Sequence, residues 1–280
     1  PLQVPQRSAL RSHTPVYKLI DRVAGRKSLS SLFTPVGGDN QSLSIMPKIA
    51  GFDGKEVEYV EVHDEPIHRR QFSNDYVYIY IAGFRPGETS LWHRHSENTL
   101  YVCVGHGAAA LNRPTDKEPF VHHASPGDLW WAMSKSAPYV HQVCLLPENT
   151  HNSHFFAMEI LRPPPTCSSR ALDHRCYSLR GEDSRPGLAR VYDFRLKPGE
   201  STGPHTLGFS GVVLCLSDGG GSLEADGGLF AGGELSKVGG WKWIDGPVSA
   251  NARNAGGSVY QAFVVEWLGE GHSVEGVSRL

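Results

Sequence analysis

The chain has 280 residues, with 27 Lys and Arg against 29 Asp and Glu, for a formal net charge of −2 at pH 7. This balance argues against a nucleic-acid-binding protein or a polybasic membrane binder. No apolar run approaches the ~18 residues of a membrane span. The 31 Gly and 19 Pro favour short strands and turns over a helical bundle. The five Cys have no CxxC spacing, so we expect reduced thiols in an intracellular protein.

Residues 1–38 are basic and rich in Ser, and Asp21 is their single acid. This composition is typical of an organelle transit segment or its remnant. The alternative is an extended arm that packs on the domain or on a neighbour. We therefore expect an irregular arm over residues 1–50, with a short helix near 16–23. The expected location is the cytoplasm, or a plastid or mitochondrion if the arm is a transit remnant.

The rest of the chain contains an internal repeat. The segment Arg85-Pro-Gly-Glu88 recurs as Lys197-Pro-Gly-Glu200, 112 positions later, and the same offset relates His93 to His205. The closing segments, around Phe156 in the first half, repeat at an offset of 107. A register kept over several segments indicates a duplicated domain. We expect one domain over 51–161, a linker rich in Pro, Ser and Arg over 162–185, and a second domain over 186–280.

Short runs rich in Val, Ile, Tyr, Phe and Trp, bounded by Gly, Pro, Asn and Asp, predict an all-β sandwich or barrel. In the first half, the expected strands are 57–62, 76–81, 100–104, 129–132, 140–145 and 154–161. The second half repeats them.

Three histidines stand where they could bind a metal. His93 and His95 are two residues apart, so on a strand both imidazoles project from the same face. His141 lies on a later predicted strand. Three converging imidazoles suit Fe(II), Mn(II), Zn(II) or Ni(II). The alternative is a set of relic histidines that no longer binds metal.

The spacing around these histidines resembles a known family. Gly87-x5-His93-x-His95 followed by Gly105, and then Pro126-Gly127-Asp128 before His141, resemble the two cupin motifs. The resemblance covers about 55–161 and 186–269. It implies a bicupin, with two tandem jelly-roll barrels in one all-β chain.

The first half departs from the cupin pattern at one ligand. The usual glutamate follows the second histidine by four or five residues, where this chain has Thr99 and Leu100. The fourth ligand is therefore missing, replaced by Asn98, or supplied by Glu97. We take Glu97 and Asn98 as candidate catalytic residues.

The segments His93–Tyr101 and Gly105–Ala109 are also similar to gentisate-type ring-cleaving dioxygenases, bicupins that use three histidines without the glutamate. This similarity implies a non-haem Fe(II) dioxygenase acting on a small chelating substrate, with one metal in the first domain. Mn or Zn, in a lyase, isomerase or hydrolytic enzyme, is the alternative. A non-catalytic cupin is the rival from another class: a small-molecule-binding module or an accessory subunit of a larger complex.

The second half has lost most of the motif. It keeps His205, but Leu207 stands at the position of His95, and residues 247–254 contain no His. We expect no metal there and a structural or dimerising role. In the first domain, Trp92, Trp130, Trp131 and Tyr139 are candidates for lining a substrate pocket. The expected partners are a small-molecule substrate and, from the family resemblance, a second copy of the chain or a larger assembly.

Overall fold

The structure is a computed structural model that describes residues 46–165, 167–217 and 223–274. The predicted arm up to residue 45, with its short helix, lies outside the described residues. In the described part, the regular elements are strands and two short 3₁₀ turns, Val62–Asp64 and Glu234–Ser236. No helix in these ranges is long and apolar enough to cross a bilayer.

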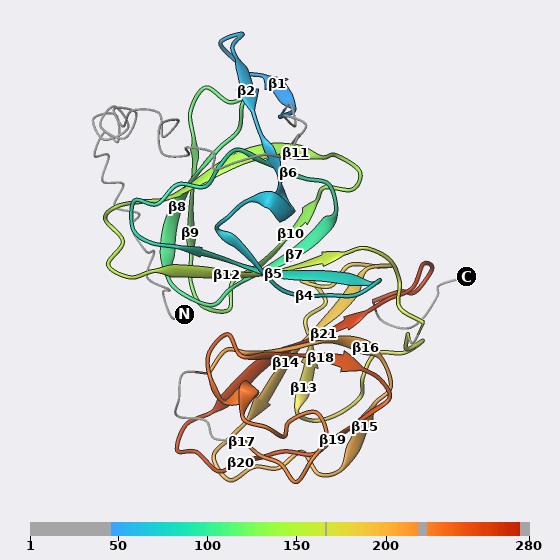
Figure 1. The fold of residues 1–280 in the computed structure, drawn as a ribbon. Coiled ribbons are helices and arrows are strands. Elements are labelled where there is room, and N and C mark those ends of the chain that lie inside the picture. The colour runs from blue at the N-terminus through green and yellow to red at the C-terminus, as the bar shows by residue number, and fades with distance from the viewer. Residues whose placement is uncertain (1–45, 166, 218–222, 275–280) are drawn as a thin grey trace, which may run out of the picture. The chain divides into compact units, whose positions relative to one another are not determined.

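The first half forms a hairpin followed by two five-stranded sheets (Figure 1). Its strands are β1 (Lys48–Ala50), β2 (Glu56–Glu58), β3 (Val60–Glu61), β4 (His68–Ser73), β5 (Val77–Phe84), β6 (His93–His95), β7 (Asn98–Cys103), β8 (Gly107–Asn112), β9 (Phe120–Ala124), β10 (Leu129–Met133), β11 (Tyr139–Leu145) and β12 (Ser153–Ile160). One sheet has the order β10-β7-β12-β5-β4, and the other has the order β3-β6-β11-β8-β9. Strands β5 to β12 divide between the two sheets in the order of an eight-stranded jelly roll.

The second half repeats this arrangement. Its strands are β13 (Tyr177–Leu179), β14 (Ala189–Leu196), β15 (His205–Leu207), β16 (Ser210–Cys215), β17 (Leu223–Glu224), β18 (Trp241–Asp245), β19 (Val248–Ala250), β20 (Arg253–Asn254) and β21 (Tyr260–Trp267). The sheet β13-β14-β21-β16-β18 matches the first sheet of the other half, and the pairs β15-β19 and β17-β20 match the second. Strands β14, β15, β16 and β18 begin 112 residues after β5, β6, β7 and β10, which confirms the duplication.

Strand β5 shows why these runs form strands buried on both faces. Tyr80, Ala82 and Phe84 belong to clusters inside the first jelly roll, whereas Val77 and Ile79 belong to a cluster shared with the second. Because side chains alternate between the faces of a strand, a strand covered on both sides reads as a nearly continuous apolar run.

The repeated Pro-Gly-Glu motif forms a turn in each half. Gly87 and Gly199 both adopt positive φ, near +78° and +77°, which glycine tolerates best. The Glu88 carboxylate accepts a hydrogen bond from the Arg85 N–H at 2.8 Å, and the second copy makes the same bond at 2.9 Å. The motif therefore sets the turn that leads into each histidine-bearing strand.

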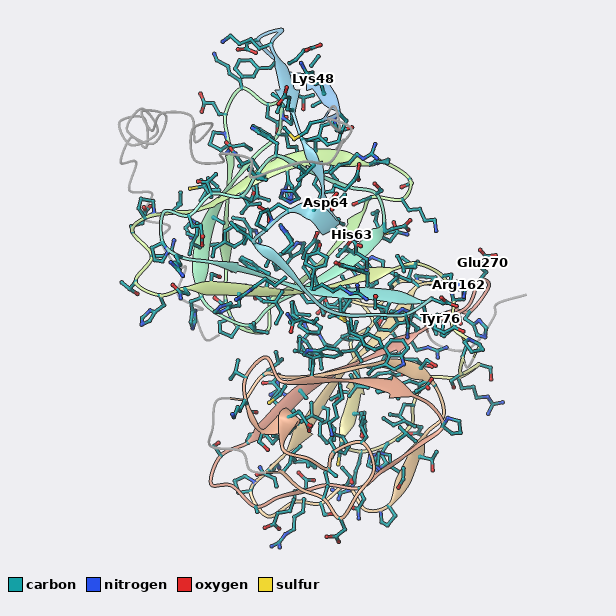
Figure 2. All side chains as sticks on the ribbon, in the orientation of Figure 1. Lys48, His63, Asp64, Tyr76, Arg162 and Glu270 are labelled. Carbon is teal, nitrogen blue, oxygen red and sulfur yellow. The ribbon has the colours of Figure 1, made fainter. Side chains whose placement is uncertain are left out.

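Two expected segments differ in detail. The strand expected over 57–62 is divided: the chain leaves the hairpin after Glu58, pairs with β6 from Val60, and turns at Val62. The segment expected as a linker contains β13, which pairs with β14. At the start of this segment, the Arg162 guanidinium pairs with Asp75 and lies 5.2 Å from the centre of the Tyr76 ring (Figure 2).

Candidate metal centre

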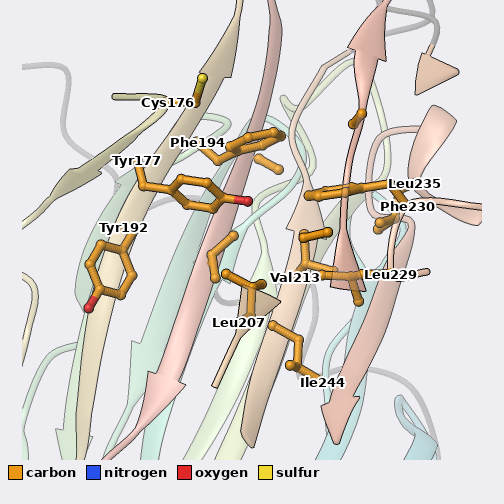
Figure 3. Close-up of a cluster of buried hydrophobic side chains, with 14 of the residues drawn as sticks. Cys176, Tyr177, Tyr192, Phe194, Leu207, Val213, Leu229, Phe230, Leu235 and Ile244 are labelled. Atoms are coloured by element: carbon orange, nitrogen blue, oxygen red, sulfur yellow. The ribbon is translucent and has the colours of Figure 1, made fainter. Parts of the chain in front are cut away.

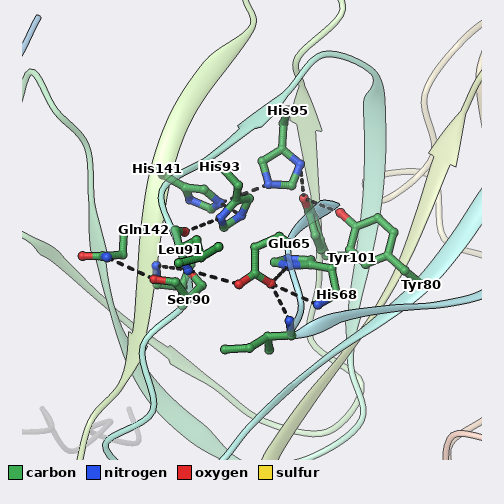
Figure 4. Close-up of polar contacts among 12 residues, drawn as sticks. Glu65, His68, Tyr80, Ser90, Leu91, His93, His95, Tyr101, His141 and Gln142 are labelled. Atoms are coloured by element: carbon green, nitrogen blue, oxygen red, sulfur yellow. Dashed lines mark hydrogen bonds and ion pairs between the residues drawn. The ribbon is translucent and has the colours of Figure 1, made fainter. Parts of the chain in front are cut away.

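The structure brings together the three histidines that the sequence singled out. His93 and His95 point into the first jelly roll from β6, and His141 lies directly across from His93 on the neighbouring β11 (Figure 4). The His141 Nε2 atom lies 2.9 Å from Nε2 of His93 and 3.0 Å from Nε2 of His95. All three side chains are buried.

These separations fit a shared metal ion. Two nitrogens bound at ~2.1 Å and at right angles to one another are about 3.0 Å apart. The tetrahedral angle at the same bond length would give about 3.4 Å. The two distances from His141 Nε2 therefore match pairs of ligands at right angles, as in an octahedral site, and imidazole is a favoured ligand of Fe, Zn, Cu and Ni.

The protonation states also suit metal binding. Burial, together with the charge of the neighbouring His68, lowers the pKa of His93 to about 4. Burial and neighbouring histidines hold the pKa values of His95 and His141 well below their usual range. All three rings are therefore neutral near pH 7. The His93 Nδ1–H donates to the Leu91 carbonyl at 2.8 Å, which leaves the lone pair on Nε2.

A chain of buried hydroxyls backs His95. Its Nδ1 lies 3.2 Å from the Tyr101 hydroxyl, which lies 3.2 Å from the Tyr80 hydroxyl. Burial raises the pKa of both tyrosines well above their usual value, so both hydroxyls remain protonated. With Tyr101 accepting from Nδ1–H, the Nε2 atom of His95 also presents a lone pair to the other histidines.

A fourth histidine, which the sequence analysis missed, lies beside these three. His68 comes from β4 in the opposite sheet, and a ring nitrogen of His68 lies within 4.8 Å of ring nitrogens of His93 and His95. Its Nδ1 is 2.5 Å from Oε2 of Glu65, which is also buried. The sequence signal is only Glu and His three residues apart ahead of a strand, a spacing that belongs to neither cupin motif.

A cavity of about 510 Å³ opens beside the histidines. Its wall is largely aromatic and apolar, with polar groups from His68, His95, His141, Tyr101, His122 and Arg113. The volume falls within the range of ~300–1,000 Å³ that is typical of small-molecule sites. The Arg113 guanidinium lies 5.6 Å from the centre of the Tyr139 ring, where it adds a positive charge to the wall.

The four aromatic candidates have different surroundings. Tyr139 lines the cavity and stacks on His95 with ring centres 5.2 Å apart. Trp130 lines the cavity and stacks on Tyr101 with ring centres 5.5 Å apart. Trp131 lines it too, but its indole N–H donates to the Asp183 carbonyl at 2.8 Å. Trp92 is not among the lining residues.

Glu97 and Asn98 both contact Lys135. The Glu97 carboxylate lies 3.5 Å from the Lys135 ammonium, and the Asn98 side-chain oxygen accepts a hydrogen bond from the Lys135 N–H at 3.1 Å. On β7, the Asn98 side chain lies on the same face as Leu100 and Val102, which belong to the hydrophobic cluster between the two halves. Tyr101 lies on the opposite face of the strand. Their catalytic role remains a prediction.

The second jelly roll has different residues at the corresponding positions. The pairing of β15 with β19 places His205 opposite Ala250 and Leu207 opposite Val248, so Leu207 and Ala250 stand where His95 and His141 stand in the first half. Both nitrogens of His205 have partners, the Tyr177 hydroxyl at 2.9 Å and the Gly203 carbonyl at 3.0 Å.

No protein-family model matches the sequence, and no curated protein matches it. The similar solved structures include a cupin domain from Bordetella pertussis, 24% identical over 34% of this chain and 91% of its own, with a TM-score of 0.30. Oxalate decarboxylase from Lactobacillus farciminis is 10% identical over 84% of this chain and 89% of its own, with a TM-score of 0.46. Salicylate 1,2-dioxygenase from Pseudaminobacter salicylatoxidans is 11% identical over 71% and 75%, with a TM-score of 0.45.

The strand order of the two halves is that of two tandem jelly rolls, the fold of a bicupin, and the three histidines lie on two paired strands of the first. What the site does is argued from its own residues, because a fold alone does not determine a function.

Proposed function

We propose that this chain is a metal-dependent bicupin enzyme, a non-haem Fe(II) dioxygenase acting on a small chelating substrate in its first jelly roll. One observation carries the proposal: three neutral imidazoles converge at 2.9 and 3.0 Å, and two of them, those of His95 and His141, line a cavity large enough for a small molecule. Fe(II) is preferred because the sequence around His93 resembles dioxygenases that use three histidines. When bound, the iron would supply the one-electron chemistry that reaction with O₂ requires.

The protein's own groups would bind and orient the substrate. With only neutral imidazoles as ligands, a divalent ion would keep its full charge, which favours an anionic, chelating substrate. Arg113 on the cavity wall favours the same charge. The rings of Trp130 and Tyr139 would pack against an apolar or aromatic body and exclude water from it.

Elemental analysis of native protein purified without chelator tests this function, beside the double variant His93→Ala/His95→Ala. His205→Ala is the matched control, because it removes the histidine of the second jelly roll. We expect about one Fe per chain in the native protein and the control and none in the double variant. We also expect native protein to consume O₂ with a catechol-like or thiol substrate.

Other outcomes would overturn this function. About one Zn or Mn per chain would point to a lyase, isomerase or hydrolytic enzyme that uses the ion as a Lewis acid. No metal in the native protein, with unchanged stability in the double variant, would leave a non-catalytic cupin, either a binding module or an accessory subunit.

A further inference from the structure

Glu65 and His68 form a buried pair with more hydrogen bonds than packing alone requires. Glu65 Oε2 accepts hydrogen bonds from the Ile67 N–H at 2.8 Å and the His68 N–H at 3.0 Å, and it meets His68 Nδ1 at 2.5 Å. Oε1 accepts from the Leu91 N–H at 3.1 Å. Both oxygens are therefore satisfied although the residue is only 2% exposed (Figure 4).

This arrangement fixes which nitrogen of His68 faces Glu65. Oε2 of Glu65 accepts hydrogen bonds from two backbone N–H groups and also contacts Nδ1 of His68, so Nδ1 is the ring nitrogen that the carboxylate holds. Nε2 is the other ring nitrogen, on the side of the ring away from Glu65, and it is the one left to bind a metal.

The His68 ring lies next to the other histidines. The centre of the His68 ring is 4.6 Å from that of His93 and 6.1 Å from that of His95. A carboxylate that holds the Nδ1–H of a histidine while Nε2 faces a metal is the usual way to orient a metal-binding imidazole.

We infer that His68 is a fourth nitrogen ligand of the metal centre and that Glu65 is a positioning residue acting through it. This inference rests on the proposed function, because it needs a metal at His93, His95 and His141. The Glu65 carboxylate thus orients the His68 imidazole and does not itself bind the metal. The metal would then be held from both sheets of the jelly roll, by β6 and β11 on one side and by β4 on the other.

Co(II) binding to metal-free protein tests the inference. Asparagine places an amide N–H about where Nδ1 of histidine stands but has no atom at the place of Nε2. His68→Asn therefore keeps a donor to Glu65 and removes the ligand. We expect it to raise the Kd for Co(II) at least ~10-fold, and X-ray absorption to show one coordinating imidazole fewer. Glu65→Gln should raise the Kd about 10- to 100-fold while the number of imidazoles is unchanged.

The matched control is His63→Asn, because His63 also pairs with a buried glutamate, Glu159, at 2.6 Å. Its Kd should equal that of the wild type. An unchanged Kd and imidazole number in His68→Asn would overturn the ligand role, and an unchanged Kd in Glu65→Gln would overturn the positioning role.

If His68→Asn does not fold, the wild-type protein decides the question. Four coordinating imidazoles in its Co(II) complex support the inference, and three overturn it. Wild-type protein that binds no Co(II) would instead remove the proposed function itself, so the two failures are distinguishable.

Discussion

The two jelly rolls share a strand order but fill their interiors in opposite ways. The first leaves a cavity beside polar groups, and the second is packed with apolar side chains (Figure 3). Strand pairing aligns four decisive positions: Ala82 with Phe194, His68 with Tyr177, His95 with Leu207, and His141 with Ala250. The second half shows that this scaffold folds without histidines at the positions of His68, His95 and His141. Their presence in the first half therefore needs a reason other than folding.

A second contrast concerns a glutamate repeated at the offset of 107. Glu159 of the first half pairs with His63, whose side chain is 44% exposed. Glu266 of the second half pairs with Arg190 at 3.0 Å, and both side chains are fully buried. Tyr192 also donates to Glu266 at 2.6 Å. One duplicated position thus carries a half-exposed pair in one half and a buried network in the other.

Removing one metal ligand should have the largest effect. We expect His141→Ala to lose most of the metal of the first half, because its Nε2 lies about 3 Å from those of both His93 and His95. The corresponding residue, Ala250, is already alanine, so His205→Ala is the comparison and should keep the full metal content. Equal metal content in both variants would contradict the proposed difference between the two jelly rolls.

The buried ion pair of the second half should give the largest change in stability. Arg190→Met leaves the Glu266 carboxylate buried without its cation, which typically costs about 3–5 kcal/mol. It also removes the hydrogen bonds of the guanidinium to the carbonyls of Ser168, Arg170, Ser273 and Val274. Urea unfolding measures the loss. Lys48→Met, at an exposed ion pair, should leave the unfolding free energy nearly unchanged.

A substitution that makes the interior of the first jelly roll more like that of the second should fill the cavity. Ala82→Phe introduces the side chain that Phe194 supplies in the second half, and Ala82 lines the cavity. Forcing an extra group into a filled space costs about 1–3 kcal/mol. A loss of this size in the binding free energy corresponds to roughly 5- to 150-fold weaker binding of a catechol-like ligand. Metal content should not change. Unweakened ligand binding, measured by calorimetry, would show that the ligand lies elsewhere.

The smallest effect is a pH dependence at His63 (Figure 2). Its hydrogen bond to Glu159 raises the pKa of His63 above 6.5, and the charges of Glu159, Asp64 and Glu61 act in the same direction. The pair therefore stabilises the fold fully below pH 6.5 and loses this contribution as pH rises through the raised value. Between pH 6 and 8.5, the unfolding free energy of wild type should fall relative to His63→Gln by less than about 1 kcal/mol. A constant difference would contradict this.

Much of this architecture is encoded in local sequence. The shared offset predicted the paired strands, because each turn and each apolar run is copied with its spacing intact. The His93-x-His95 spacing predicted two imidazoles on one face, since alternation along a strand is a local property. Their meeting with His141 follows from the pairing of β6 with β11.

Other parts depend on contacts that local patterns do not specify. His68 belongs to the opposite sheet, so it meets the other histidines only because the two sheets pack against one another. Trp130 and Trp131 are adjacent, and which of them stacks on Tyr101 depends on strand register. Asn98 and Glu97 lie next to the expected ligand position in the sequence, yet their contacts to Lys135 come from a segment 37 residues away from Asn98.

The position of His68 on β4 has a consequence for stability. A metal held by His68 together with β6 and β11 would act as a non-covalent cross-link between the two layers of the first jelly roll. Binding to the folded state alone contributes about 2.7 kcal/mol when free metal is 100 times its Kd. For a chain of this size, that corresponds to a rise in Tm of roughly 5–10 °C. The melting temperature of this half would then depend on the concentration of free metal. The melting temperature of the second half, whose interior is apolar, would not.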